Sequence, residues 1–194
     1  MSLQETKTDL LKDLKIDEAR RFNSLEAMVT GDTRYLRDLR INLKNTLTSS
    51  ENISLKEAYL LALAVASNEK NEILVCSFTD YAKENGATEG EIAEIHACAS
   101  MLSINNVLYR FRHFAKEEAY NNMPAGIKMN VMMNPVLGRE FFELVSLAVS
   151  AVNGCETCVS SHEASVRKLG TSQARVFDAI RLASVVRGLS VAVH

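Results

Sequence analysis

The chain has 194 residues, of which 47% are hydrophobic and 24% are charged, and its formal net charge is −2. This composition is typical of an ordinary globular protein and excludes a disordered chain, and no apolar run is long enough to cross a membrane. The near-neutral charge gives no reason to expect a nucleic-acid partner. Because the N-terminus is polar and lacks a hydrophobic signal core, we expect a cytoplasmic protein.

Apolar residues recur every three to four positions over long segments, and only Pro124 and Pro135 interrupt the chain as prolines. This pattern predicts an all-α protein. Ser54 with Glu57 has the spacing of a capping box at a helix start, and Gly86 is placed to end a helix. The predicted helices cover residues 8–14, 18–29, 33–45, 54–67, 71–85, 89–101, 106–113, 139–152, 155–169 and 172–191.

A repeat appears when the chain is shifted by 84 residues against itself. Leucine, alanine, valine, glutamate, serine and glycine positions then coincide without a gap, for example Leu60 with Leu144 and Gly86 with Gly170. We therefore predict two related helical units, residues 55–104 and 139–188, within one all-α domain spanning residues 1–194. Residues 1–34 are predicted to form an N-terminal helical extension, and residues 120–137 a linker.

The segment from Asn153 to His162 contains two thiols and an imidazole at helical spacing. In a helix, Cys155, Cys158 and His162 would lie on one face, so that the histidine can take a proton from either thiol. The preceding Asn-Gly pair indicates a turn, which places Cys155 at a helix N-terminus. The dipole and the imidazole would both lower a thiol pKa from about 8.5 toward neutrality. We expect a redox centre.

The first repeat unit serves as an internal control for this motif. The positions that correspond to Cys155, Cys158 and His162 are occupied by Asn71, Leu74 and Phe78. The fold therefore does not require two thiols and an imidazole there, which favours a functional role for them.

Glu143 lies twelve residues before Cys155 in an apolar helix, where an unpaired carboxylate would be costly. If the two helices form a hairpin, Glu143 can reach His162 and complete a Glu–His–Cys proton relay. The alternative is a surface glutamate at the edge of an amphipathic stripe. In the first unit, Tyr59 stands in the corresponding position.

Other roles for the cysteines are less well supported by the sequence. A zinc site usually needs four ligands, and no second ligand pair exists, because the remaining histidines are scattered. A disulfide within one helical turn closes too short a loop to stabilise the fold much. Inert core thiols remain as a further alternative, and we expect Cys76 and Cys98 to be buried hydrophobes of that kind.

Three segments resemble the alkyl hydroperoxide reductase D family of the carboxymuconolactone decarboxylase-like superfamily. They begin at Asn105 (Asn-Asn-Val-Leu-Tyr-Arg-Phe-Arg-His-Phe), at Gly126 and at Phe142, the last containing Cys-x-x-Cys-x-x-x-His with its upstream glutamate. The resemblance runs from about residue 35 to the C-terminus. It implies an all-α fold of two related units, a homotrimer and a peroxidase activity driven by a dithiol.

By this resemblance, Cys158 attacks the peroxide and becomes a sulfenic acid, and Cys155 is its partner and proton donor. Glu143 and His162 would correspond to the proton relay of the family. The two cysteine roles stay exchangeable, since a helix N-terminus favours Cys155 as the thiolate whereas contact with His162 favours Cys158. Thr157 departs from the family, whose well-known members have a histidine there, and a hydroxyl cannot shuttle a proton near pH 7.

Taken together, the sequence predicts an antioxidant thiol peroxidase that cycles between dithiol, sulfenic acid and disulfide without bound metal, haem or flavin. No nucleotide-binding glycine pattern is present, so an external dithiol must supply the electrons. The resemblance implies a lipoyl-bearing protein, and a peroxiredoxin is an alternative redox partner. A decarboxylase of the carboxymuconolactone type, using Arg110, Arg112 and Lys128, and a non-catalytic helical interaction module are the rival hypotheses.

Overall fold

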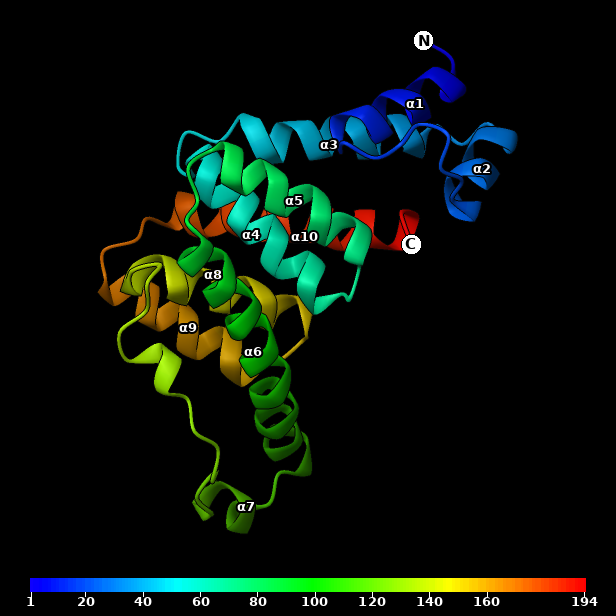
Figure 1. The fold of residues 1–194 in the computed structure, drawn as a ribbon. Coiled ribbons are helices and arrows are strands. Elements are labelled where there is room, and N and C mark those ends of the chain that lie inside the picture. The colour runs from blue at the N-terminus through cyan, green and yellow to red at the C-terminus, as the bar shows by residue number, and fades with distance from the viewer.

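A computed structural model of the chain describes residues 1–194, and it contains α-helices, one short 3-10 helix and no strand. The predicted all-α fold is confirmed (Figure 1). No helix is both long enough and apolar enough to cross a membrane. The elements are α1 (Leu3–Asp13), α2 (Asn23–Thr30), α3 (Tyr35–Thr48), α4 (Leu55–Asn68), α5 (Glu72–Glu84), α6 (Glu89–Ala115), α7 (Glu118–Asn122), η1 (Asn130–Met132), α8 (Arg139–Val152), α9 (Glu156–Lys168) and α10 (Gln173–Ala192).

The two related units correspond helix by helix. Helices α4 and α8, and likewise α5 and α9, begin 84 residues apart and end 84 residues apart, and α6 and α10 also begin 84 residues apart. The glycines that follow α5 and α9, Gly86 and Gly170, both have positive φ, +87° and +91°. That conformation is one that only glycine adopts without strain. Each unit is therefore a helical hairpin followed by a third helix.

An ion pair recurs at corresponding positions with its charges exchanged. In the first unit, Lys56 Nζ lies 2.8 Å from Glu91 Oε1. In the second unit, the corresponding residues are Glu140 and Arg175, and Arg175 Nη2 lies 2.9 Å from Glu140 Oε2. The positions therefore keep their pairing across the repeat although every charge has changed sign.

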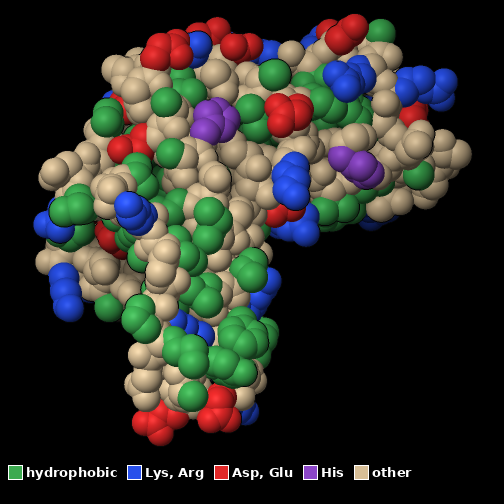
Figure 2. Space-filling view, turned by 60° about the horizontal axis from the view of Figure 1, so that its bottom comes forward, with side chains coloured by type: hydrophobic (Ala, Val, Ile, Leu, Met, Phe, Trp, Pro, Cys, Tyr) green, Lys and Arg blue, Asp and Glu red, His purple; other side chains and the backbone are tan.

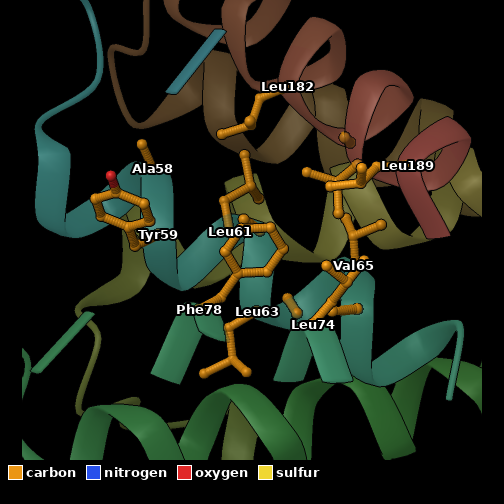
Figure 3. Close-up of a cluster of buried hydrophobic side chains, with 14 of the residues drawn as sticks. Ala58, Tyr59, Leu61, Leu63, Val65, Leu74, Phe78, Leu182 and Leu189 are labelled. Atoms are coloured by element: carbon orange, nitrogen blue, oxygen red, sulfur yellow. The ribbon is translucent and has the colours of Figure 1, made fainter. Parts of the chain in front are cut away.

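Helix α4 is the centre of the core. Every residue from Ala58 to Ala66 is buried, because α5, α6, α8, α10 and α3 all pack around it. Figure 3 shows the side chains of α4 meeting Leu74 and Phe78 of α5, and Leu182 and Leu189 of α10. A helix that is apolar on all sides is stable only in such a position.

The N-terminal helices extend the bundle at one end. Helix α1 packs on α2 and α3, and α3 packs along α10, so that Leu10, Leu11, Leu25 and Leu36 are fully buried. Figure 1 shows α1 to α3 at the end of the molecule opposite to α7. The extension therefore contributes to the core and lies far from the segment that carries α7.

The structure corrects several predicted helix bounds. Residues 89–101 and 106–113 form one continuous helix, α6, although two helices were predicted. The asparagines at the predicted break are tolerated because Asn106 forms side-chain hydrogen bonds with Ser150 and Asn153. Helix α7 (Glu118–Asn122) overlaps the start of the predicted linker. Helix α1 begins at Leu3 because Ser2 and Glu5 form a capping box, and α2 begins only at Asn23.

The prediction for the two isolated cysteines was half right. Cys98 is buried beside Ser146, and burial raises the pKa of its thiol to about 12, so it is inert as a nucleophile. Cys76, in contrast, is exposed, and its predicted burial was wrong. It lies on the solvent-facing side of α5, whereas Leu74 and Phe78 provide the buried side.

Candidate active site

The motif cysteines lie at the turn between α8 and α9. Asn153 ends α8, and Gly154 follows with a φ of +66°, which reverses the chain within two residues. Cys155 is the N-cap residue of α9, with φ −95° and ψ 92°. The predicted turn thus places Cys155 at a helix N-terminus and Cys158 in the first turn of that helix.

Cys155 and Cys158 form a disulfide, with their Cα atoms 5.3 Å apart. The two residues differ in accessibility, because Cys155 is 0% exposed whereas Cys158 is 7% exposed. A reagent that approaches from solvent therefore meets Cys158 first.

His162 and Glu143 meet between the two helices. His162 Nδ1 lies 2.7 Å from Glu143 Oε2, and the side chains are 12% and 20% exposed. The predicted contact between these residues is therefore present, and the surface-glutamate alternative does not hold. With the carboxylate as acceptor, Nδ1 carries the proton and Nε2 is left outside this hydrogen bond.

A cavity of about 260 Å3 opens beside Cys158 and His162. Two of the four predicted site residues, Cys158 and His162, line the cavity. Cys155 and Glu143 do not, but each contacts one of the two, Cys155 through the disulfide and Glu143 through the hydrogen bond with His162. The wall contains no lysine, arginine, aspartate or glutamate. The residues that line it are Asn105, Asn106, Tyr109, Met129, Met132, Thr157, Cys158, Ser161 and His162.

Helix α6 and the segment that contains η1 supply five of the nine residues in this wall, none of which is among the site residues predicted from the sequence. Asn105 and Asn106 are both buried, at 6% and 2% exposed, in a helix whose other buried residues are mainly apolar. The two adjacent asparagines stand at the gap between the predicted helices 89–101 and 106–113, and their polarity beside apolar neighbours is the signal that the sequence offers.

Polar contacts connect α6 to the turn that carries the cysteines. Arg110 Nη1 donates a hydrogen bond to the backbone oxygen of Asn153 (2.6 Å), and the side-chain amide of Asn153 donates to Asn106 Oδ1 (2.8 Å). His113 Nε2 lies 3.2 Å from Glu156 Oε2 in the first turn of α9. These contacts fix the turn relative to α6.

The arrangement suits two-electron sulfur chemistry. A cysteine pair lies at a helix N-terminus beside a cavity without acidic or basic side chains other than His162, whose imidazole has a carboxylate partner. The structure contains no group of three or more histidine, cysteine, aspartate or glutamate side chains arranged to hold a metal ion.

Comparison with known proteins places these features in context. Residues 118–194 match the model of the carboxymuconolactone decarboxylase family. The chain is 35% identical over 171 residues to a protein of Rhodopseudomonas palustris named alkyl hydroperoxide reductase AhpD, covering 88% of this chain and 93% of the relative. It is 37% identical to proteins of the same name from Coxiella burnetii, covering 80% and 89%, and from Frankia alni, covering 82% and 85%.

Proposed function

Since the chain belongs to the family of alkyl hydroperoxide reductase AhpD, we propose that it is a thiol peroxidase in which Cys155 and Cys158 reduce hydroperoxides. The observation that carries this proposal is the position of Cys158, at the wall of a neutral cavity that it shares with His162. The peroxide enters that cavity and meets Cys158, because Cys155 is fully buried.

The reaction divides into two steps with balanced electrons. The Cys158 thiolate attacks the terminal oxygen of the hydroperoxide, the S–O bond forms and the O–O bond breaks. The sulfur loses two electrons, and the alkoxide that leaves takes up a proton. Cys155 then attacks the sulfur of the sulfenic acid, which releases water and forms the disulfide.

His162 and Glu143 would manage the protons of these steps. His162 takes the proton of the Cys158 thiol and returns it to the leaving alkoxide, while the carboxylate of Glu143 holds the imidazole and stabilises its charged form. Thr157 lines the same cavity, but its hydroxyl takes no part in proton transfer near pH 7.

The reductant would be an external dithiol, and no bound cofactor takes part. Because Cys155 is 0% exposed, the dithiol attacks Cys158 and Cys155 leaves as the thiolate at the helix N-terminus. A lipoyl group on a carrier protein has a suitable pair of thiols on a slender arm, and a peroxiredoxin is the alternative redox partner. The proposal includes a cytoplasmic location, where thiols are kept reduced.

The decarboxylase alternative receives little support from the cavity. A carboxylated lactone would require cationic groups, and neither arginine nor lysine lines the wall. Arg110 is engaged with Asn153, and Arg112 donates to the backbone oxygen of Met123.

We also propose that the chain forms a homo-oligomer, and a trimer by family resemblance. The projecting end of α6 and the following α7 expose large apolar side chains, and Figure 2 shows hydrophobic side chains gathered on this lower arm. Such a patch is unusual on a monomer. The exposed apolar residues of this arm, called the arm patch below, are Val107, Phe111, Phe114, Tyr120 and Met123.

Consumption of tert-butyl hydroperoxide with dihydrolipoamide as reductant tests the proposed function. We expect turnover by the wild-type protein, unaffected by a chelator, and its loss in both Cys158→Ser and Cys155→Ser. Cys76→Ser is the matched control, because Cys76 is an exposed thiol outside the site. Turnover that survives in Cys158→Ser would refute the proposal.

A further inference from the structure

One buried acceptor beside the cavity has no donor. Asn105 is 6% exposed, and its side-chain oxygen Oδ1 is buried without a hydrogen-bond partner. Its amide nitrogen Nδ2 donates only to the sulfur of Met129, at 2.9 Å, and thioether sulfur is a weak acceptor. A buried polar atom without a partner destabilises the fold, so its presence calls for a functional explanation.

The neighbouring asparagine shows that the helix can satisfy such a side chain. Asn106 Nδ2 donates to Ser150 Oγ (3.1 Å), and its Oδ1 accepts from Asn153 (2.8 Å). The only other buried side-chain atom without a partner is Ser77 Oγ, on α5. Ser77 does not line the cavity, whereas Asn105 does, together with Cys158 and His162.

We propose that Asn105 is a substrate-positioning residue, whose Oδ1 accepts the hydrogen bond of the hydroperoxide O–H. This inference rests on the proposed function. A hydroperoxide has one O–H donor, at the oxygen that Cys158 attacks, and an organic group at the other oxygen. Tyr109, Met129 and Met132 give the cavity an apolar side for the organic group. The favoured substrates are therefore neutral organic hydroperoxides.

The hydrogen bond is preserved as the reaction proceeds. When the Cys158 thiolate attacks, the terminal oxygen keeps its hydrogen and becomes the sulfenic acid, and the alkoxide leaves with a proton from His162. The S–O–H group can then continue to donate to Asn105 Oδ1. In the disulfide, neither sulfur carries a hydrogen that could be donated to this acceptor.

The test is a single-turnover reaction of the reduced protein, with wild type beside Asn105→Leu. We expect the rate constant for tert-butyl hydroperoxide to fall about tenfold, the effect of one lost hydrogen bond. The rate at which methyl methanethiosulfonate, which has no hydrogen-bond donor, modifies Cys158 should change by less than about twofold. Ser77→Ala is the matched control, since it removes the other unpartnered polar atom, and its rates should equal those of wild type.

The outcomes separate the inference from the proposed function. If wild type and Asn105→Leu reduce the hydroperoxide at equal rates, the role of Asn105 is refuted while the peroxidase activity stands. An equal fall in the hydroperoxide and methyl methanethiosulfonate rates would also refute it, because Asn105 would then support only the cysteine. If wild type does not react, the proposed function fails and the inference with it. Asn105→Ala gives the same comparison if the leucine variant does not fold.

Discussion

Cys155 and Asn71 occupy the same position in two corresponding helices, each as the residue that caps the helix N-terminus. Asn71 Oδ1 accepts a hydrogen bond from the backbone N–H of Leu74 (3.1 Å). In the reduced protein, the sulfur of Cys155 would have the same relation to the backbone N–H of Cys158. An oxygen acceptor that stabilises the scaffold in one unit is thus replaced by a sulfur that can carry negative charge in the other.

The Glu143 carboxylate gives a prediction for a single residue. Glu143→Gln keeps the shape of the side chain but removes the charge that stabilises protonated His162. We expect kcat for tert-butyl hydroperoxide to fall by about 100-fold, the lower range for loss of general acid–base catalysis. Steady-state kinetics with dihydrolipoamide measures this effect.

Glu163→Gln is the control for that experiment, because Glu163 follows His162 but its side chain is 47% exposed. Its kcat should stay within about twofold of wild type, since an exposed charge contributes little. A Glu143→Gln enzyme with the wild-type rate would show that the contact between Glu143 and His162 is structural only.

At the scale of helices, Arg175 joins the starts of α4, α8 and α10. Its guanidinium Nη2 lies 2.7 Å from Glu57 Oε1 and 2.9 Å from Glu140 Oε2, and its side chain is 17% exposed. Nη1 also donates to the backbone oxygen of Asn52. One side chain therefore ties both repeat units together near their helix N-termini.

Loss of this connection should destabilise the fold. Arg175→Met leaves two partly buried carboxylates without their partner, and we expect the free energy of unfolding to fall by about 3 kcal/mol. Urea denaturation followed by circular dichroism gives this value. Arg181→Met, which removes an exposed partner of Asp178, should cost less than about 0.5 kcal/mol. Equal effects of the two substitutions would contradict the assigned importance of Arg175.

The same ion pairs predict how stability depends on pH. The hydrogen bond from Arg175 holds the pKa of Glu140 below its ordinary value of 4.5. At Glu57, burial raises the pKa, but the hydrogen bonds from Arg175 and Ser54 outweigh burial, so that the pKa is lowered overall. A carboxyl with a lowered pKa in the folded state contributes stability above its unfolded pKa. That contribution is lost as the pH falls through the folded pKa.

We therefore expect the free energy of unfolding to be steady between about pH 5 and 7 and to decrease at lower pH. Urea titrations at several pH values measure this. In Arg175→Met the decrease should be shallower, because the two carboxyl groups no longer have a stabilised charged form. A steeper acid loss in the variant than in wild type would contradict this account.

The bounds of the helices show which features of the fold can be predicted from the sequence. A capping box located the start of α4, and terminal glycines located the ends of α5 and α9, each to within about two residues, because these signals are local. The continuity of α6 could not be read in this way, since the side chain of Asn106 finds its hydrogen-bond partners 44 and 47 residues away along the chain.

The same distinction applies to the site. Helical spacing and the repeat led to Cys155, Cys158, His162 and Glu143, and the structure brings His162 and Glu143 into contact. The contribution of Asn105 could not be predicted, because it depends on how α6 crosses α9 and on an acceptor left without a donor.

At the scale of the whole molecule, the arm patch consists of large apolar side chains that no other part of the chain covers. Phe114→Glu would place a charge at a side chain that is 67% exposed. If the arm patch is the contact between subunits, the variant should dissociate to monomers, since a buried unpaired charge is costly. Sedimentation velocity measures the change.

Phe177→Glu is the matched control, because Phe177 is 65% exposed but lies on α10 outside the arm patch. It should keep the assembly state of wild type. A wild-type protein that sediments as a monomer, or a Phe114→Glu variant that keeps the oligomer, would refute the arm patch as an interface.

The repeat also means that the protein contains a second hairpin, α4 and α5, with the same backbone arrangement as α8 and α9 but without the four candidate site residues. Grafting glutamate, two cysteines and histidine onto Tyr59, Asn71, Leu74 and Phe78 would reproduce the motif on α4 and α5 without the surroundings of the native site. There the buried amide of Asn71 faces the backbone of Ser190, at the end of α10. The reactivity of such a graft would show how much of the chemistry depends on the four side chains alone. The remainder would depend on their surroundings, including the residues of α6 that line the native cavity.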